Sequence, residues 1–109
     1  MPDLPDFPFD FEFYNETDLP DAEYYEMAYD QITDLAEGHK DVVGASVSLK
    51  ELSSEETPHA YESIVTLYVR PTNISAREVA DSALTSLQQA LEASIKQVRE
   101  KRERLKGHL

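Results

Sequence analysis

The sequence predicts an α+β domain, in which an antiparallel or mixed sheet of three or four strands carries both helices on one face. Three segments alternate apolar and polar residues, and two others repeat apolar residues at helical spacing. The predicted order is β-α-β-β-(β)-α. The 109 residues suffice for one domain. We expect it at residues 9–106, with an acidic tail at 1–8 and a short tail at 107–109.

The first strand is expected at residues 7–14, where every second residue is a phenylalanine. A period of two predicts a strand with one apolar face. Pro8 has no amide hydrogen, which favours an edge strand or a strand start. The aromatic side of the strand should be buried beneath an apolar cover, and it consists of Phe7, Phe9, Phe11 and Phe13.

A helix is expected from Asp18 to Gly38. Asp18 is a plausible N-cap, Pro20 is tolerated in the first turn, and Gly38 suits the position after the last turn. One face of this helix is apolar and the opposite face is acidic. The apolar face holds Tyr25, Ala28, Tyr29, Ile32, Leu35 and Ala36, and the acidic face holds Glu23, Glu26, Asp30, Asp34 and Glu37.

Two further strands form a long predicted hairpin around the polar connection 53–59. The first should turn Val43, Ala45, Val47 and Leu49 inward. The second should run from Tyr61 to Arg70 with Ser63, Val65, Leu67 and Val69 inward. Because all three strands are apolar on one side only, both helices should cover that side. The open face would then show Asp10, Glu12, Tyr14, Ser46, Ser48, Lys50, Glu62, Ile64, Thr66, Tyr68 and Arg70.

The last helix is expected to start at a capping box, with Ser75 as N-cap and Glu78 at the third position, and to end near Lys106. This leaves little room for a fourth strand at residues 71–75. Such a helix is about 45 Å long, whereas a ten-residue strand spans about 33 Å. Its last turns should therefore extend beyond the sheet. The predicted apolar stripe is Val79, Ala80, Ala83, Leu84, Leu87, Leu91, Ile95 and Val98.

Charge is unevenly distributed along the chain. The net charge is −12, and residues 1–39 hold twelve Asp and Glu with no Lys or Arg. Residues 96–106 hold six Lys and Arg against two Glu. A strongly acidic molecule repels phosphate backbones, so any contact with nucleic acid must be local and sensitive to salt. The acidity also fits adaptation to a salty cytoplasm.

Several classes of site have no support in the residues. The chain has no cysteine, and His39, His59 and His108 lack a second ligand at metal-binding spacing. Neither a nucleophile elbow nor a phosphate loop is present. We therefore expect no enzyme, metal or cofactor. Without a signal peptide or a long apolar run, a cytoplasmic protein with no membrane contact is expected.

Two surface features remain as candidate sites. The basic helix end could contact phosphates, or it could be a solvated helix terminus that suits the helix dipole. It comprises Lys96, Arg99, Lys101, Arg102, Arg104 and Lys106. The open sheet face offers a partner-binding set of Tyr14, Ile64, Tyr68 and Arg70. Aromatic residues there could stack bases or pack against a protein, or they could be ordinary surface residues. The acidic surroundings favour a protein.

Residues 83–101, ALTSLQQALEASIKQVREK, combine a regular leucine spacing with a basic finish. In both respects they are similar to the last helix of the family of ribosome hibernation-promoting factors and ribosome-associated inhibitors. Residues 34–49, DLAEGHKDVVGASVSL, resemble the end of its first helix and its second strand. The family's first helix is usually basic, whereas here it is acidic, and the family's fourth strand is expected to be short or missing here.

The resemblance implies a factor that binds rRNA of the small ribosomal subunit where mRNA and tRNA would lie, idling translation under stress without catalysis. The basic helix end is the part that matches the family's basic residues. A second hypothesis is an acidic inhibitor or adaptor whose first helix engages a basic protein. A third is self-association, in which an uncovered third strand or the open sheet face pairs with a second copy.

Overall fold

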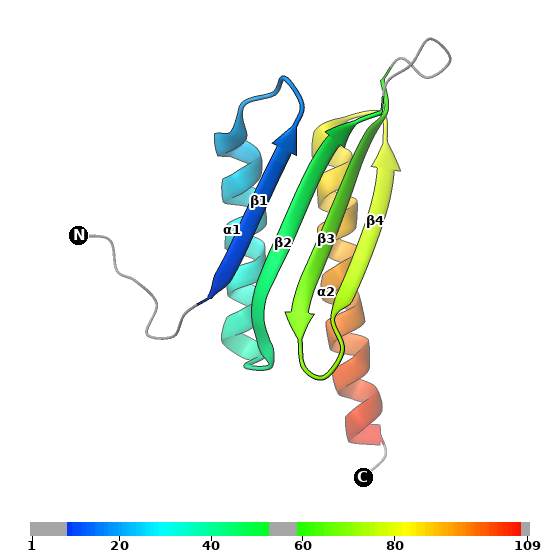
Figure 1. Ribbon diagram of the computed structural model, residues 1–109. Helices are drawn as coiled ribbons and strands as arrows, with labels where there is room; N and C mark the ends of the chain where they lie inside the picture. The colour runs from blue at the N-terminus through cyan, green and yellow to red at the C-terminus, as the bar shows by residue number, and fades with distance from the viewer. Residues whose placement is uncertain (1–8, 53–58, 108–109) are drawn as a thin grey trace, which may run out of the picture.

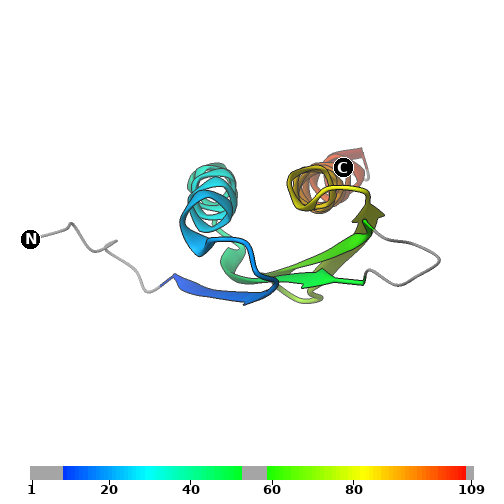
Figure 2. The ribbon, with the colours of Figure 1, turned by 90° about the horizontal axis from the view of Figure 1, so that it is seen from above.

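The computed structural model describes residues 9–52 and 59–107, with side chains as far as Lys101. Four strands form one mixed sheet in the order β1-β2-β3-β4, with β1 parallel to β2 and the other pairs antiparallel. Both helices lie on one face and leave the other uncovered (Figures 1 and 2). The predicted α+β class is confirmed. The elements are β1 (Asp10–Glu16), α1 (Asp21–Gly38), β2 (Val42–Glu51), β3 (Tyr61–Val69), β4 (Ile74–Ala80) and α2 (Ala83–Gly107).

The core lies between the sheet and the two helices. Alternation along β2 and β3 turns every second side chain toward the helices, as expected for a strand with one wet face. The inward set predicted for the third strand is confirmed, because Ser63, Val65, Leu67 and Val69 are all buried. The largest side chains with no exposed surface are Ile32, Val47, Leu49, Val65, Leu67, Leu87 and Leu91.

The start of β2 departs from the predicted alternation. The register with β3 shifts between Val42 and Gly44, so one extra residue is inserted there. Such a bulge reverses which side chains point inward on either side of it. Val42 is therefore buried, while Val43, predicted inward, is 38% exposed. From Ala45 onward the predicted inward set is correct.

The fourth strand corrects the prediction of a capping box at Ser75–Glu78. Residues 74–80 form β4, which pairs with β3 from Ile74 opposite Leu67 to Ala80 opposite Tyr61. Ile74 and Ala76 alternate with polar neighbours and are buried, and pairing with β3 satisfies the backbone of both strands. Long-range pairing thus outweighs a local helix signal. Val79 and Ala80 belong to this strand and not to a helix stripe.

Helix α2 starts later than predicted, after Ser82. The Ser82 hydroxyl oxygen accepts a hydrogen bond from the Thr85 amide at 3.1 Å, so serine caps the helix, but seven residues beyond the predicted cap. Ala83, Leu87, Leu91 and Val98 are buried as predicted, whereas Leu84 is 47% exposed.

β3 lies inside the sheet, because β2 and β4 pair with its two sides. The hypothesis that an uncovered third strand pairs with a second copy is therefore wrong. The edges of the sheet are β1 and β4. The shortened or missing fourth strand expected from the family comparison is also wrong, since β4 has seven residues.

The phenylalanines of β1 are only half-buried in the structure. Phe11 packs edge-on against Tyr25 and Tyr29 of α1, with ring centroids 5.2 and 5.3 Å apart. Phe13 meets Tyr25 in the same way at 5.7 Å. Because β1 is an edge strand under one helix, its aromatic side retains exposed surface, which corrects the expectation of full burial. Phe7 lies outside the described residues.

Both ends of α1 differ from the predicted caps. The helix begins at Asp21 with Pro20 at the N-cap position and no side-chain cap, so Asp18 is not the cap. The Asn15 amide instead donates to the Leu19 carbonyl and to the Asp21 carboxylate, both at 2.7 Å. Gly38 is the last helical residue and has a negative φ. The C-cap is His39, whose Nδ1 donates to the Leu35 carbonyl at 3.2 Å.

Candidate nucleic-acid interface

The last turns of α2 extend beyond the end of the sheet (Figure 1). The helix has 25 residues and is therefore about 37 Å long. Lys96 and Arg99 are exposed and Lys101 is half-buried. Among the described side chains, no carboxylate forms a salt bridge with any of these three residues. The predicted residues Arg102, Arg104 and Lys106 lie on the same helix, but their side chains are outside the described part.

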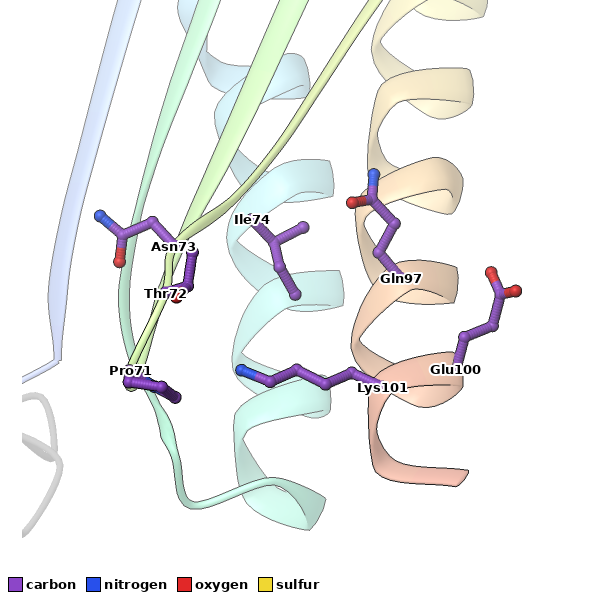
Figure 3. Close-up of a pocket in the computed structure, with 7 residues that line it drawn as sticks. All are labelled: Pro71, Thr72, Asn73, Ile74, Gln97, Glu100 and Lys101. Atoms are coloured by element: carbon purple, nitrogen blue, oxygen red, sulfur yellow. The ribbon is translucent and has the colours of Figure 1, made fainter. Parts of the chain in front are cut away.

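A notch separates this helix end from the turn between β3 and β4 (Figure 3). Its volume is about 580 Å³. Ile74 points from the strand toward Gln97, and Lys101 reaches across toward the turn (Figure 3). The Lys101 ammonium donates to the backbone carbonyl of Arg70 at 3.3 Å. An ammonium has three donors, so this contact leaves donors for an anion.

Lys96 and Arg99 also border a groove of about 500 Å³ between α1 and α2. Acidic residues border the same groove, namely Asp34, Glu92 and Glu100. Two cations of the basic helix end therefore lie beside three carboxylates in this groove. A contact of this end with phosphates stays a prediction, and with acids so near it would have to be local and sensitive to salt.

The four predicted partner-binding residues do not form one cluster. Tyr14 is 52% exposed on β1, and Ile64 on β3 lies in the same cross-strand row, because Ser48 is the partner of both. Tyr68 lies nearer the other end of β3, opposite Gly44. Arg70 follows the end of β3, and its carbonyl belongs to the notch contact with Lys101.

A carboxylate that the sequence reasoning left unassigned connects the two tyrosines. The Tyr14 hydroxyl donates to Glu12 Oε2 at 2.7 Å, and the Tyr68 hydroxyl donates to Glu12 Oε1 at 3.0 Å. Glu12 and Tyr14 share a strand face, which their i, i+2 spacing could have indicated. The approach of Tyr68 depends on the register of three strands, which no local pattern gives.

These hydrogen bonds set the protonation behaviour of the cluster. Donation by Tyr14 and then Tyr68 lowers the pKa of Glu12 below its ordinary value of 4.5, because both bonds favour the charged form. The same bonds, together with the negative charge of Glu12, raise the pKa of both tyrosines above 10.0. The cluster is therefore a carboxylate with two neutral phenols at neutral pH.

The lowered pKa predicts a measurable titration. Followed by NMR of its side-chain carboxyl carbon, Glu12 should titrate below pH 4.5, and Tyr14→Phe should raise the midpoint more than Tyr68→Phe. Because the folded pKa is depressed, the stabilisation is present above the unfolded pKa and is lost as pH falls through the folded value. Tyr61→Phe serves as a control that should not move the midpoint. A wild-type midpoint at or above 4.5 would contradict the hydrogen-bonded geometry.

The described residues contain neither a group of three or more His, Asp or Glu that could hold a metal ion nor a helix long and apolar enough to cross a membrane. His59 is exposed, His39 is half-buried at the helix end, and His108 lies outside the described residues.

The fold is closely matched by solved structures. A ribosomal subunit interface protein from Coxiella burnetii superimposes with a TM-score of 0.68 and 7% identity, covering 86% of this chain and 98% of that protein. The N-terminal domain of Protein Y from Thermus thermophilus gives a TM-score of 0.67 and 11% identity, covering 82% and 93%. The chain shares the fold of these proteins. The fold that the resemblance to hibernation factors implied is thereby confirmed.

At such low identity the likeness concerns the fold. A comparison of the sequence with protein-family models finds no match, and a comparison with curated proteins finds none either.

Proposed function

We propose that the protein is a ribosome-associated factor of the hibernation type, which binds the small subunit and occludes it without catalysis. The observation that carries the proposal is the basic end of α2, which extends beyond the sheet on a fold shared with a ribosomal subunit interface protein. Lys96 and Arg99 are exposed and without a salt bridge to a described acid. Exposed Lys and Arg side chains in this state can donate to phosphate oxygens.

The mechanism is electrostatic docking. The basic end, made of Lys96, Arg99, Lys101, Arg102, Arg104 and Lys106, contacts rRNA phosphates and releases their counterions. The acidic face of α1 then points toward solvent or toward basic ribosomal proteins, because a net charge of −12 opposes burial of that face against RNA. Occlusion follows from the volume of the bound domain, and no bond is made or broken.

Sedimentation of lysate through sucrose at low and raised salt tests the proposal. The wild-type protein should travel with ribosomal particles at low salt and leave them as salt rises. The variant carrying Arg99→Glu, Arg102→Glu and Arg104→Glu should stay at the top of the gradient. The matched variant with lysine at these three positions keeps the charge and should co-sediment. Ribosome association that survives the glutamate variant would refute docking through the basic end.

A second candidate is an acidic module that binds a basic protein, and the exposed acidic face of α1 favours it. Glu23, Glu26, Asp30, Asp34 and Glu37 are all exposed along the helix. In that case the wild-type protein would remain at the top of the gradient at every salt concentration. A pull-down would recover a basic protein, and replacing Glu23, Glu26 and Asp30 by their amides would abolish the recovery.

A further inference from the structure

The uncovered face of the sheet carries a hydrogen-bonded cluster of side chains that the proposed docking of α2 does not use. Glu12 and Tyr14 come from β1, and Tyr68 comes from β3. Both hydroxyls donate to the one carboxylate, at 2.7 and 3.0 Å. Tyr68 must cross β2 to reach it, and it does so over Gly44. A Cβ built on Gly44 would lie 2.9 Å from the Tyr68 ring, so the glycine keeps this crossing open.

The cluster is negatively charged, and its charge is not matched by a cation among the described side chains. Among the described side chains, no Lys or Arg forms a salt bridge with Glu12. Asp10 adds a second negative charge on the same face, and its field acts on both tyrosines. Tyr14 keeps 52% of its surface exposed, so its ring is accessible to a partner. Each carboxylate oxygen accepts one phenol and retains a second lone-pair direction.

A carboxylate beside an exposed tyrosine ring favours one kind of ligand, a planar cation. A cation over a tyrosine face is stabilised by the ring, and a guanidinium also matches the planar geometry of a carboxylate. Lysine is a compact, strongly hydrated charge and gains less from such a site. Phosphate is repelled by Asp10 and Glu12.

We propose that Glu12, Tyr14 and Tyr68 form a binding site for an arginine side chain of a basic protein partner. Figure 2 shows that the face of the sheet opposite the two helices is uncovered. The three residues alternate with inward-facing neighbours such as Phe13 and Leu67, so their site lies on this uncovered face, separate from the basic end of α2. A protein with one basic and one acidic surface can bind an RNA with the first and an arginine-rich protein segment with the second. The proposal does not depend on the ribosome being the partner.

The test compares two peptides of twelve residues, each with three cations separated by glycine and serine, one with arginine and one with lysine. Their affinities for the full-length protein are measured by fluorescence anisotropy at fixed salt. The ratio of the two affinities removes the general attraction of any cation to an acidic protein. The wild type should prefer the arginine peptide about three- to fivefold. The Glu12→Gln and Tyr14→Ala variants should show a ratio near one.

Two controls distinguish binding at the arginine site from binding at other charged surfaces. Glu26→Gln removes the same charge from α1 and should keep the arginine preference, and so should Arg99→Glu in the basic end. NMR shift mapping on the wild-type protein, which needs no variant to fold, should place the arginine peptide at Tyr14 and Tyr68. Equal affinity of the wild type for both peptides, or shifts centred on α1, would overturn the proposal. Loss of ribosome binding by Arg99→Glu with the arginine preference intact would show that the two surfaces act independently.

Discussion

Leu87→Ala should lower the free energy of unfolding by about 2 to 5 kcal/mol. Leu87 has no exposed surface and belongs to the main core cluster, on the α2 face that packs against β3 and β4. Truncation removes buried methyl groups and leaves a cavity. Because α2 packs against the sheet along its length, it cannot move inward to fill this cavity. Urea denaturation followed by circular dichroism measures the loss as a lower midpoint at unchanged slope.

Leu84→Ala is the matched control for this prediction. It removes the same atoms one turn earlier on the same helix, but Leu84 is 47% exposed. The control should therefore lose less than about 1 kcal/mol, since a half-exposed side chain gains less from burial. Equal losses for the two variants would mean that α2 does not pack on the sheet in the register described here.

Gly44→Ala should destabilise the protein by about 1 to 3 kcal/mol, and it should also disturb the tyrosine cluster. An added Cβ would lie 2.5 Å from the backbone carbonyl oxygen of Asp10 and 2.9 Å from the ring of Tyr68. The first neighbour is backbone in a paired strand and cannot move aside without loosening β1. The second can move only by giving up its bond to Glu12. Thermal unfolding and the titration midpoint of Glu12 report the two effects separately.

Gly38→Ala provides the control for Gly44→Ala. Nothing lies within 4 Å of the added Cβ at Gly38, and the φ of this residue is negative. Alanine there should stabilise the protein by about 0.4 to 1 kcal/mol, because it restricts the unfolded chain. If Gly44→Ala were also stabilising, the close approach of β1 to β2 would be wrong.

The sequence patterns were informative wherever burial follows a simple period. The inward sets of Ala45–Leu49 and Ser63–Val69 and the placement of both helices on one side of the sheet follow from one-sided alternation. The acidic face of α1 follows from helical spacing. These elements are long, and their apolar residues have one available core. Local pattern and tertiary packing therefore agree.

The errors occurred where a local signal competes with pairing between strands. Ser75 to Glu78 have the spacing of a capping box, yet pairing with β3 makes them a strand. The bulge beside Gly44 turns Val43 outward instead of inward, and no residue type in this segment predicts the bulge. Asp18 is as good a cap as Ser82 in isolation, but the Asn15 contacts place the start of α1 later.

The two candidate surfaces differ in how well the sequence could predict them. The basic end of α2 is contiguous, so counting charges finds it. The arginine site consists of residues 12, 14 and 68, and Tyr68 reaches Glu12 over Gly44 on the strand between them. It exists only once the register of β1, β2 and β3 is fixed. The sequence predicts Tyr14 and Tyr68 as exposed aromatic residues, but no local pattern indicates the carboxylate that joins them.

The most direct test of ribosome docking places a photo-reactive amino acid at Gln97, which is exposed in the basic end and carries no charge. A second protein carries it at Ala22, which is exposed on α1. Both are irradiated with purified small ribosomal subunits at low salt. Docking through the basic end predicts that position 97 crosslinks to rRNA, while position 22 gives protein crosslinks or none. Crosslinks to rRNA from position 22 alone would contradict it.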